Sequence, residues 1–200
     1  MSLEEMLRAA MCKIEQEEKK NQETISMGEY IQNSPGKSPI EWIVIDKREE
    51  SKLVISKYGI DAKIYNDSSE NIKWKTSSLR KWLNKDFIDA AFSENEKDLI
   101  LETKNSENPD ETEDKIFLLS DSEVMKYFKA FNSEKTLPTK YAQKQGAPEG
   151  NMGYTTWWLK EPGTISSDIF GSSTGKMYGA NGPIVNEIYA VRPAMWIKSI

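Results

Sequence analysis

Residues 40–55 have the sequence IEWIVIDKREESKLVI, in which two apolar runs flank a charged segment. In the first run Ile40, Trp42 and Val44 alternate with Ile43 and Ile45, so apolar side chains lie on both faces of an extended chain. This pattern is typical of a central strand that is covered on both sides. The polar residues 47–51 predict a turn, after which residues 53–55 form the second strand of a hairpin.

Short strands and helices are predicted on both sides of this hairpin. The segment 25–31 has the character of a strand, and the apolar run 116–119 predicts another, buried one. Helical spacing of apolar residues predicts helices over 78–92 and 120–131, while the acidic segment 104–114 is interpreted as an exposed loop. We therefore expect residues 24–200 to form a single α+β domain with a mixed or antiparallel sheet, flanking helices and a long Gly-rich loop region.

The first 23 residues predict an amphipathic helix and a linker. One helical stripe over residues 2–20 contains Leu3, Met6, Leu7, Ala10, Met11 and Ile14. An isolated helix of this length is marginal in water, so it must dock either on its own domain or on a second copy, which would give a homodimer. Cys12 lies beside the stripe, and because no basic partner that would lower its pKa is evident, we interpret it as a small helix-surface or packing residue rather than a reactive thiol.

Composition excludes several classes of function. The 200 residues contain no histidine and one cysteine, which removes Ser-His-Asp and Cys-His nucleophiles, His-ligated metals and Cys-rich zinc sites. The net charge of −5 argues against bulk binding to nucleic acid, and no apolar run is long enough for membrane insertion. The acidic start lacks a signal-peptide pattern, and the location stays open between the cytoplasm and, if the chain is a fragment, the cell surface.

The last third is the candidate binding region. Eight of the 11 glycines lie between Gly146 and Gly182, mixed with aromatic and amide residues, and such irregular segments often carry binding loops. Trp157 and Trp158 lie on a predicted strand, so one should enter the core while the other faces outward, unless both are buried. For Arg192 a buried, carboxylate-paired structural role is favoured over a ligand contact. The predicted ligand-binding residues are Tyr154, Trp158, Tyr178, Asn181 and Arg192.

A set of segments in a fixed order resembles a known family. It includes Ser78-Leu79-Arg80-Lys81-Trp82-Leu83-Asn84, Trp157-Trp158-Leu159-Lys160-Glu161-Pro162-Gly163 and Val191-Arg192-Pro193-Ala194-Met195-Trp196-Ile197. Over residues 25–198 the chain resembles a bacterial family of domains of unknown function with WWLRSPG-like and VRPALWI-like segments, although Lys160-Glu161 replaces the Arg-Ser pair. The resemblance implies a layout similar to C-type-lectin-like and formylglycine-generating-enzyme-like domains, and it implies no activity.

Two motifs in this region do not support a cofactor or metal. The segment 171–176, GSSTGK, has the wrong glycine spacing for a phosphate-binding loop and is interpreted as a turn. Glu161-Pro162-Gly163 is similar to the Glu-Pro-Asn signature of sugar-binding C-type lectins, but glycine replaces asparagine. Calcium needs six to eight oxygen ligands, so a Pro-Gly turn is favoured. We expect no cofactor and no metal.

The functional prediction is a non-catalytic recognition module that binds a glycan or protein ligand through the Gly-rich third. Two alternatives stay open, a structural domain of a larger protein and a glycan hydrolase that uses a pair of carboxylates. Whether the chain is an enzyme is therefore undecided, with a non-enzymatic role favoured. The candidate acids are Glu41, Asp61, Glu161, Asp168 and Glu187.

Overall fold

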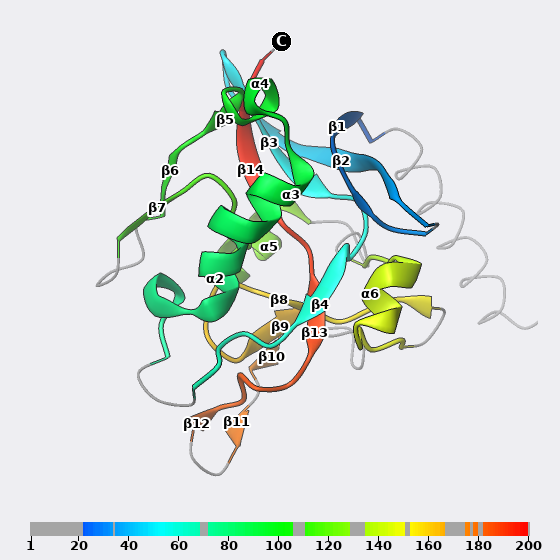
Figure 1. Ribbon diagram of the computed structural model, residues 1–200. Coiled ribbons are helices and arrows are strands. Elements are labelled where there is room, and N and C mark those ends of the chain that lie inside the picture. Colours follow the sequence, from blue (N-terminus) through cyan, green and yellow to red (C-terminus); the bar gives the residue numbers. More distant parts are fainter. Residues whose placement is uncertain are drawn as a thin grey trace, which may run out of the picture.

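The computed structural model describes residues 22–33, 35–68, 72–105, 111–128, 135–150, 153–166, 175–176, 178–179 and 182–199 (Figure 1). The predicted N-terminal helix, with Cys12, lies outside the described residues. Asp168 and Asn181 also lie outside them.

The hairpin predicted from residues 40–55 is confirmed. Strands β2 (Lys37–Lys47) and β3 (Ser51–Ser56) pair antiparallel, with Val44 opposite Val54. Ile40 and Trp42 are almost completely buried, because they face the core from β2, an inner strand of a five-stranded antiparallel sheet. Its order is β1-β2-β3-β14-β5, with β1 (Thr24–Ile31), β14 (Ala194–Lys198) and β5 (Ile100–Leu101).

A second five-stranded sheet continues from the first. Two chain segments run through both sheets, β3 into β4 (Asp61–Lys63) and β13 (Tyr189–Val191) into β14. Backbone bonds from Ser56 to Pro193, 2.9 Å, and from Ile60 to Val191, 3.0 Å, join these segments where they bend. The sheets therefore form one curled, half-barrel surface (Figure 1). The second sheet has the order β10-β9-β8-β13-β4, with β8 (Trp157–Trp158), β9 (Thr164–Ser166) and β10 (Gly175–Lys176).

Two small hairpins lie outside these sheets. Strands β6 (Thr103–Asn105) and β7 (Thr112–Asp114) form one, and β11 (Tyr178–Gly179) and β12 (Gly182–Pro183) form the other. The turn predicted at Pro162-Gly163 is present between β8 and β9, and Gly163 has a φ of 70° there, which only glycine adopts easily.

The helices are short and their ends are set by side-chain caps. Ser77 accepts a hydrogen bond from the backbone of Arg80, and Ser120 forms a capping box with Glu123. A π-helical segment, Leu83–Phe87, joins two of the helices into one helical stretch. The described helices are η1 (Trp74–Thr76), α2 (Ser78–Trp82), α3 (Ile88–Ala91), α4 (Glu94–Lys97), α5 (Asp121–Tyr127) and α6 (Lys140–Lys144).

The predicted fold class is wrong. Instead of an α+β domain with flanking helices and a C-type-lectin-like layout, the chain is mostly β, a curled antiparallel sheet with a few short helices. The helix predicted over 120–131 ends at Tyr127, because Phe128 leaves the helical conformation while its ring stays buried. The segment 104–114 is not simply an exposed loop, since strand residues at both of its ends form β6 and β7, and Thr112 and Asp114 are buried.

One hydrophobic core fills the curve of the sheets. Its largest fully buried side chains include Trp42, Trp157, Trp158 and Tyr65. Within the described part of the chain, no helix combines the length and the apolar character needed to cross a bilayer.

Candidate functional site

Trp158, one of the predicted ligand-binding residues, is completely buried. Its Nε1 donates to the carbonyl oxygen of Lys63 over 2.8 Å, which ties β8 to the end of β4. The indole ring packs edge-on against Tyr65 and Tyr189, with ring centroids 5.4 and 4.9 Å apart. Trp158 therefore joins the second sheet to the core. Trp157 is also fully buried, so of the two predictions for this pair the one with both indoles buried is correct.

Arg192 is also buried, at the bend between β13 and β14. Its Nε donates to the carbonyl oxygen of Ser56 over 2.9 Å, and its guanidinium carbon lies 5.1 and 5.4 Å from the ring centroids of Trp157 and Phe128. Neighbouring residues of a strand face opposite sides, so Arg192 contacts the Trp157 face and Trp158 occupies the other. The structure does not bring Trp158 and Arg192 together on one surface.

Of the other three predicted residues, Tyr154 has a side chain that the structure describes. Tyr154 is half-buried, and the amino group of Lys135 lies 5.4 Å from its ring centroid. Tyr178 belongs to strand β11, of which the backbone is described. Asn181 lies outside the described residues.

Asp61 is the most deeply buried of the described candidate acids, with 1% of its surface exposed. Its Oδ2 accepts from the Tyr30 hydroxyl over 2.8 Å, and its Oδ1 accepts from the backbone N–H of Ala62 over 2.7 Å. Burial raises the pKa of the Asp61 carboxyl above its ordinary value, although Lys63, 3.9 Å away, and the Tyr30 hydroxyl oppose the shift. The carboxylate thus joins β1 to β4 inside the core.

The remaining candidate acids have separate places. Glu161 accepts from the first backbone N–H of α5 over 3.0 Å, so it stabilises the start of that helix. Glu41 pairs with Lys57 at 3.1 Å on the surface, Glu187 is exposed, and Asp168 lies outside the described residues. The described residues contain no group of three or more acidic or sulfur ligands that could hold a metal ion.

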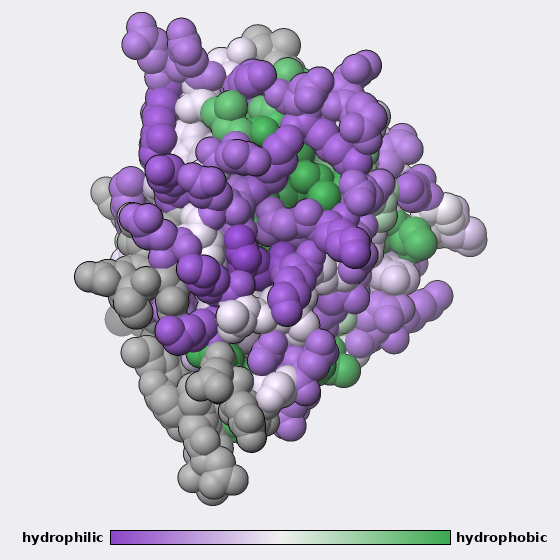
Figure 2. Space-filling view, turned by 60° about the vertical axis from the view of Figure 1, so that its left-hand side comes forward, coloured by the Kyte–Doolittle hydropathy of each residue, from purple (hydrophilic) through white to green (hydrophobic). Residues whose placement is uncertain are grey.

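The described surface is mainly polar. Figure 2 shows the face that carries α2 and the β6–β7 hairpin, where hydrophilic side chains prevail and hydrophobic ones form small separate areas. The strongly exposed large hydrophobic residues that the structure describes come from four different segments, so they do not predict one apolar docking face. They are Ile31, Met125, Leu137 and Ile188.

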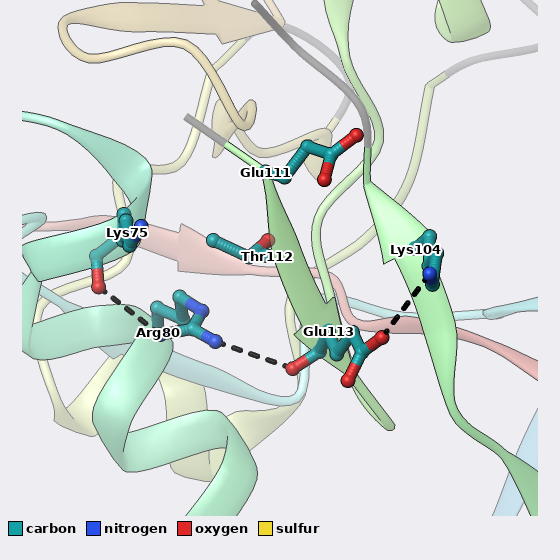
Figure 3. Close-up of a pocket in the computed structure, with 6 residues that line it drawn as sticks. All are labelled: Lys75, Arg80, Lys104, Glu111, Thr112 and Glu113. Carbon is teal, nitrogen blue, oxygen red and sulfur yellow. Dashed lines mark hydrogen bonds and ion pairs between the residues drawn. The ribbon is translucent and has the colours of Figure 1, made fainter. Parts of the chain in front are cut away.

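A charged hollow of about 410 Å³ lies between the η1–α2 segment and the β6–β7 hairpin (Figure 3). This volume falls within the range of small-molecule sites, roughly 300–1,000 Å³. We call it the α2–hairpin hollow. It is lined by Lys75, Arg80, Lys104, Glu111, Thr112 and Glu113.

Asp114 is a buried carboxylate that fixes the position of Arg80, one of the cations that line the hollow. Oδ1 of Asp114 accepts from Nε of Arg80 over 2.6 Å, while Oδ2 accepts from Trp74 Nε1 over 3.0 Å and from Thr112 Oγ1 over 2.7 Å. Thr112 and Asp114 share one face of β7 because they are two residues apart. The carboxylate therefore joins η1, α2 and β7 at one point, and the position of Arg80 follows from it.

Arg80 also contacts both walls of the hollow. Its terminal nitrogens donate to the carbonyl oxygens of Lys75 over 3.0 Å and Glu113 over 3.2 Å (Figure 3). A guanidinium has more N–H donors than these contacts and the Asp114 bond use, so it can still bind an acceptor. With its side chain 22% exposed, Arg80 is a fixed cation that the hollow presents to solvent.

Sequence reasoning missed the α2–hairpin hollow. Arg80 and Asp114 are 34 positions apart, and no periodicity connects them. Local pattern gives no signal either, because residues 111–114, ETED, contain no apolar residue and so lack the apolar–polar alternation of a half-buried strand.

The fold and the hollow define a mainly β domain with a polar, open site beside a small hairpin. The model of the family described as "Domain of unknown function (DUF6273)" matches residues 49–199, and the chain belongs to this family. A search of curated proteins found no match. A search of solved structures likewise found none.

Proposed function

We propose that this chain is a non-catalytic recognition domain that binds a glycan or protein ligand by polar contacts. The observation that carries the proposal is the position of Arg80, a cation fixed by the buried carboxylate of Asp114 at the wall of an open hollow. A donor that is already ordered loses little conformational entropy when a ligand binds, so affinity is gained from preorganisation. This arrangement supports binding, and it does not require a reacting group.

The Gly-rich third, residues 146–182, is a second surface for the same function. Trp158 supports this proposal because it fixes β8, a strand of this third, in the core. Tyr154 supplies a half-exposed ring on this part of the chain, next to Lys135. Aromatic rings of this kind stack on sugars and on protein side chains.

Glycan and peptide arrays, read together with hydrolysis of the same compounds, test the proposal. The variants Lys75→Gln and Tyr154→Ser separate the two surfaces, and Lys144→Gln, an exposed lysine on α6, is the matched control. Binding without turnover that one of the two variants weakens supports a recognition domain. Turnover of any compound overturns the non-catalytic assignment, and complete absence of binding in both arrays favours a structural domain.

The predicted homodimer through residues 2–20 stays a prediction about partners. Light scattering on the full chain and on a chain without residues 1–20 decides between the two docking modes. A dimer that becomes a folded monomer on truncation supports association of two copies. A monomer that only loses thermal stability supports docking on its own domain.

A further inference from the structure

The α2–hairpin hollow has opposite charges on its two walls (Figure 3). Lys75 and Arg80 come from the η1–α2 wall, and Glu111 comes from the hairpin wall, directly before β7. Lys104 and Glu113 face each other across the β6–β7 pair and form an ion pair of 3.6 Å. Glu111 is therefore the acidic side chain of the hairpin wall that lies outside the Lys104–Glu113 ion pair.

Ion pairs within the protein already balance most of these charges. Asp114 balances Arg80 at 2.6 Å, and Glu113 balances Lys104. Within the part of the chain that the structure describes, Lys75 and Glu111 form no ion pair within 4 Å. One cation and one anion on opposite walls thus remain for a ligand, and the spare N–H donors of Arg80 lie on the cationic side.

We propose that the α2–hairpin hollow binds a small zwitterion, a free α-amino acid. The carboxylate of the ligand lies against Lys75 and Arg80, where a guanidinium and an ammonium donate charge-assisted hydrogen bonds. The ammonium group of the ligand lies against Glu111. This inference rests on the proposed recognition function, and for this hollow it names a free amino acid as the ligand in place of a glycan or a protein.

A zwitterion fits the hollow better than a ligand of one charge. A plain anion would meet the unbalanced charge of Glu111 on the hairpin wall, and a plain cation would meet that of Lys75 on the other. Like-charge contacts of this kind act against the wrong partner and so provide specificity. A ligand with both charges satisfies the two walls at once.

Ligand-observed NMR with the standard amino acids, followed by calorimetric titration of each hit, tests the inference on the full chain. We expect Lys75→Gln and Glu111→Gln each to weaken binding about tenfold, the usual effect of losing a hydrogen bond between charged groups. The matched controls Lys144→Gln and Glu49→Gln change exposed residues outside the hollow, and their affinities should stay within about twofold of the parent. Salt should weaken binding in the parent protein.

Analogues of the ligand that lack one charged group test each half of the zwitterion separately. For each hit, the analogue without the carboxylate and the analogue without the amine should both bind at least about tenfold more weakly. Equal binding of either analogue, binding unchanged by the two hollow variants, or no binding of any amino acid would each overturn the inference. If amino acids fail but the arrays give a ligand that Lys75→Gln weakens, the zwitterion is wrong and the recognition function stands. If nothing binds in either experiment, both are wrong.

Discussion

Replacing Asp114 with asparagine tests whether this buried carboxylate organises the α2–hairpin hollow. Its two oxygens accept from three donors within the described part of the chain, Arg80 Nε at 2.6 Å, Thr112 Oγ1 at 2.7 Å and Trp74 Nε1 at 3.0 Å. An asparagine side chain has a single acceptor oxygen, and its NH₂ group must then face at least one of these donors. The substitution keeps the shape of the residue, but it removes the counter-ion of Arg80 and makes one contact repulsive.

The expected loss of stability is large. Removing one partner of a buried ion pair costs about 3–5 kcal/mol, because the other charge is left without compensation. The Asp114 side chain is 0% exposed, whereas that of Arg80 is 22% exposed and keeps part of its hydration. We therefore expect a loss near the lower end, about 3 kcal/mol. A domain of this kind is stable by roughly 5–15 kcal/mol, so the change is easily measured.

Urea denaturation followed by tryptophan fluorescence measures this loss, with the free energy of unfolding taken by linear extrapolation. Arg80→Met and the double variant complete a cycle that isolates the coupling between the two residues. Glu113→Gln, an exposed carboxylate next to Asp114 on β7, is the control and should change stability by less than about 0.5 kcal/mol. A loss below about 1 kcal/mol for Asp114→Asn, or a coupling near zero, would refute the assigned role.

Four further substitutions test the fold. Gly28→Ala should destabilise the chain by about 2–4 kcal/mol in urea, because φ is +70° and a Cβ would lie 2.8 Å from the carbonyl oxygen of Ala91. Gly36→Ala, with φ +90° and no atom within 4 Å, has only the backbone strain and should cost about 1 kcal/mol. Burial raises the pKa of Asp61 above 3.8, so its contribution to stability falls as pH rises from 3.8 through the folded-state pKa. Asp61→Asn should remove this fall in unfolding measurements across pH. Ser120→Ala removes the cap of α5 and should lower stability by about 1 kcal/mol in urea, whereas a change below about 0.3 kcal/mol would contradict the capping role.

The sequence predicted the elements that depend on local pattern. The β2–β3 hairpin follows from two apolar runs around a charged turn, and the start of α5 follows from the Ser120–Glu123 spacing. The fold class was missed because the second sheet is built of strands of two or three residues, too short for a period of two to be detected. Their pairing depends on partners that are remote in the chain, such as Ala190 opposite Trp157.

The candidate site depends on the same remote pairing. The burial of Trp158 and Arg192 follows from their contacts with Lys63 and Ser56, which lie 95 and 136 positions away. A tryptophan on a strand gives no local sign of which face will be covered. The side chains of the hollow gather around Asp114, whose burial depends in turn on η1 and α2. The sequence pattern thus identified residue types suited to binding, but the tertiary fold determines whether their side chains lie in the core or at the surface.

Strands β1 and β2 precede the region that the family model matches, which begins at residue 49. They nevertheless complete its core. Trp42 on β2 is fully buried and donates to the carbonyl oxygen of Met27 over 2.8 Å, and Tyr30 on β1 donates to the buried carboxylate of Asp61 over 2.8 Å. Without these strands β3 would become an open edge, and Asp61 would lose its hydroxyl partner inside an apolar core, at a cost of about 1–3 kcal/mol for that contact alone. We infer that residues 24–47 fold together with the matched region as one cooperative unit.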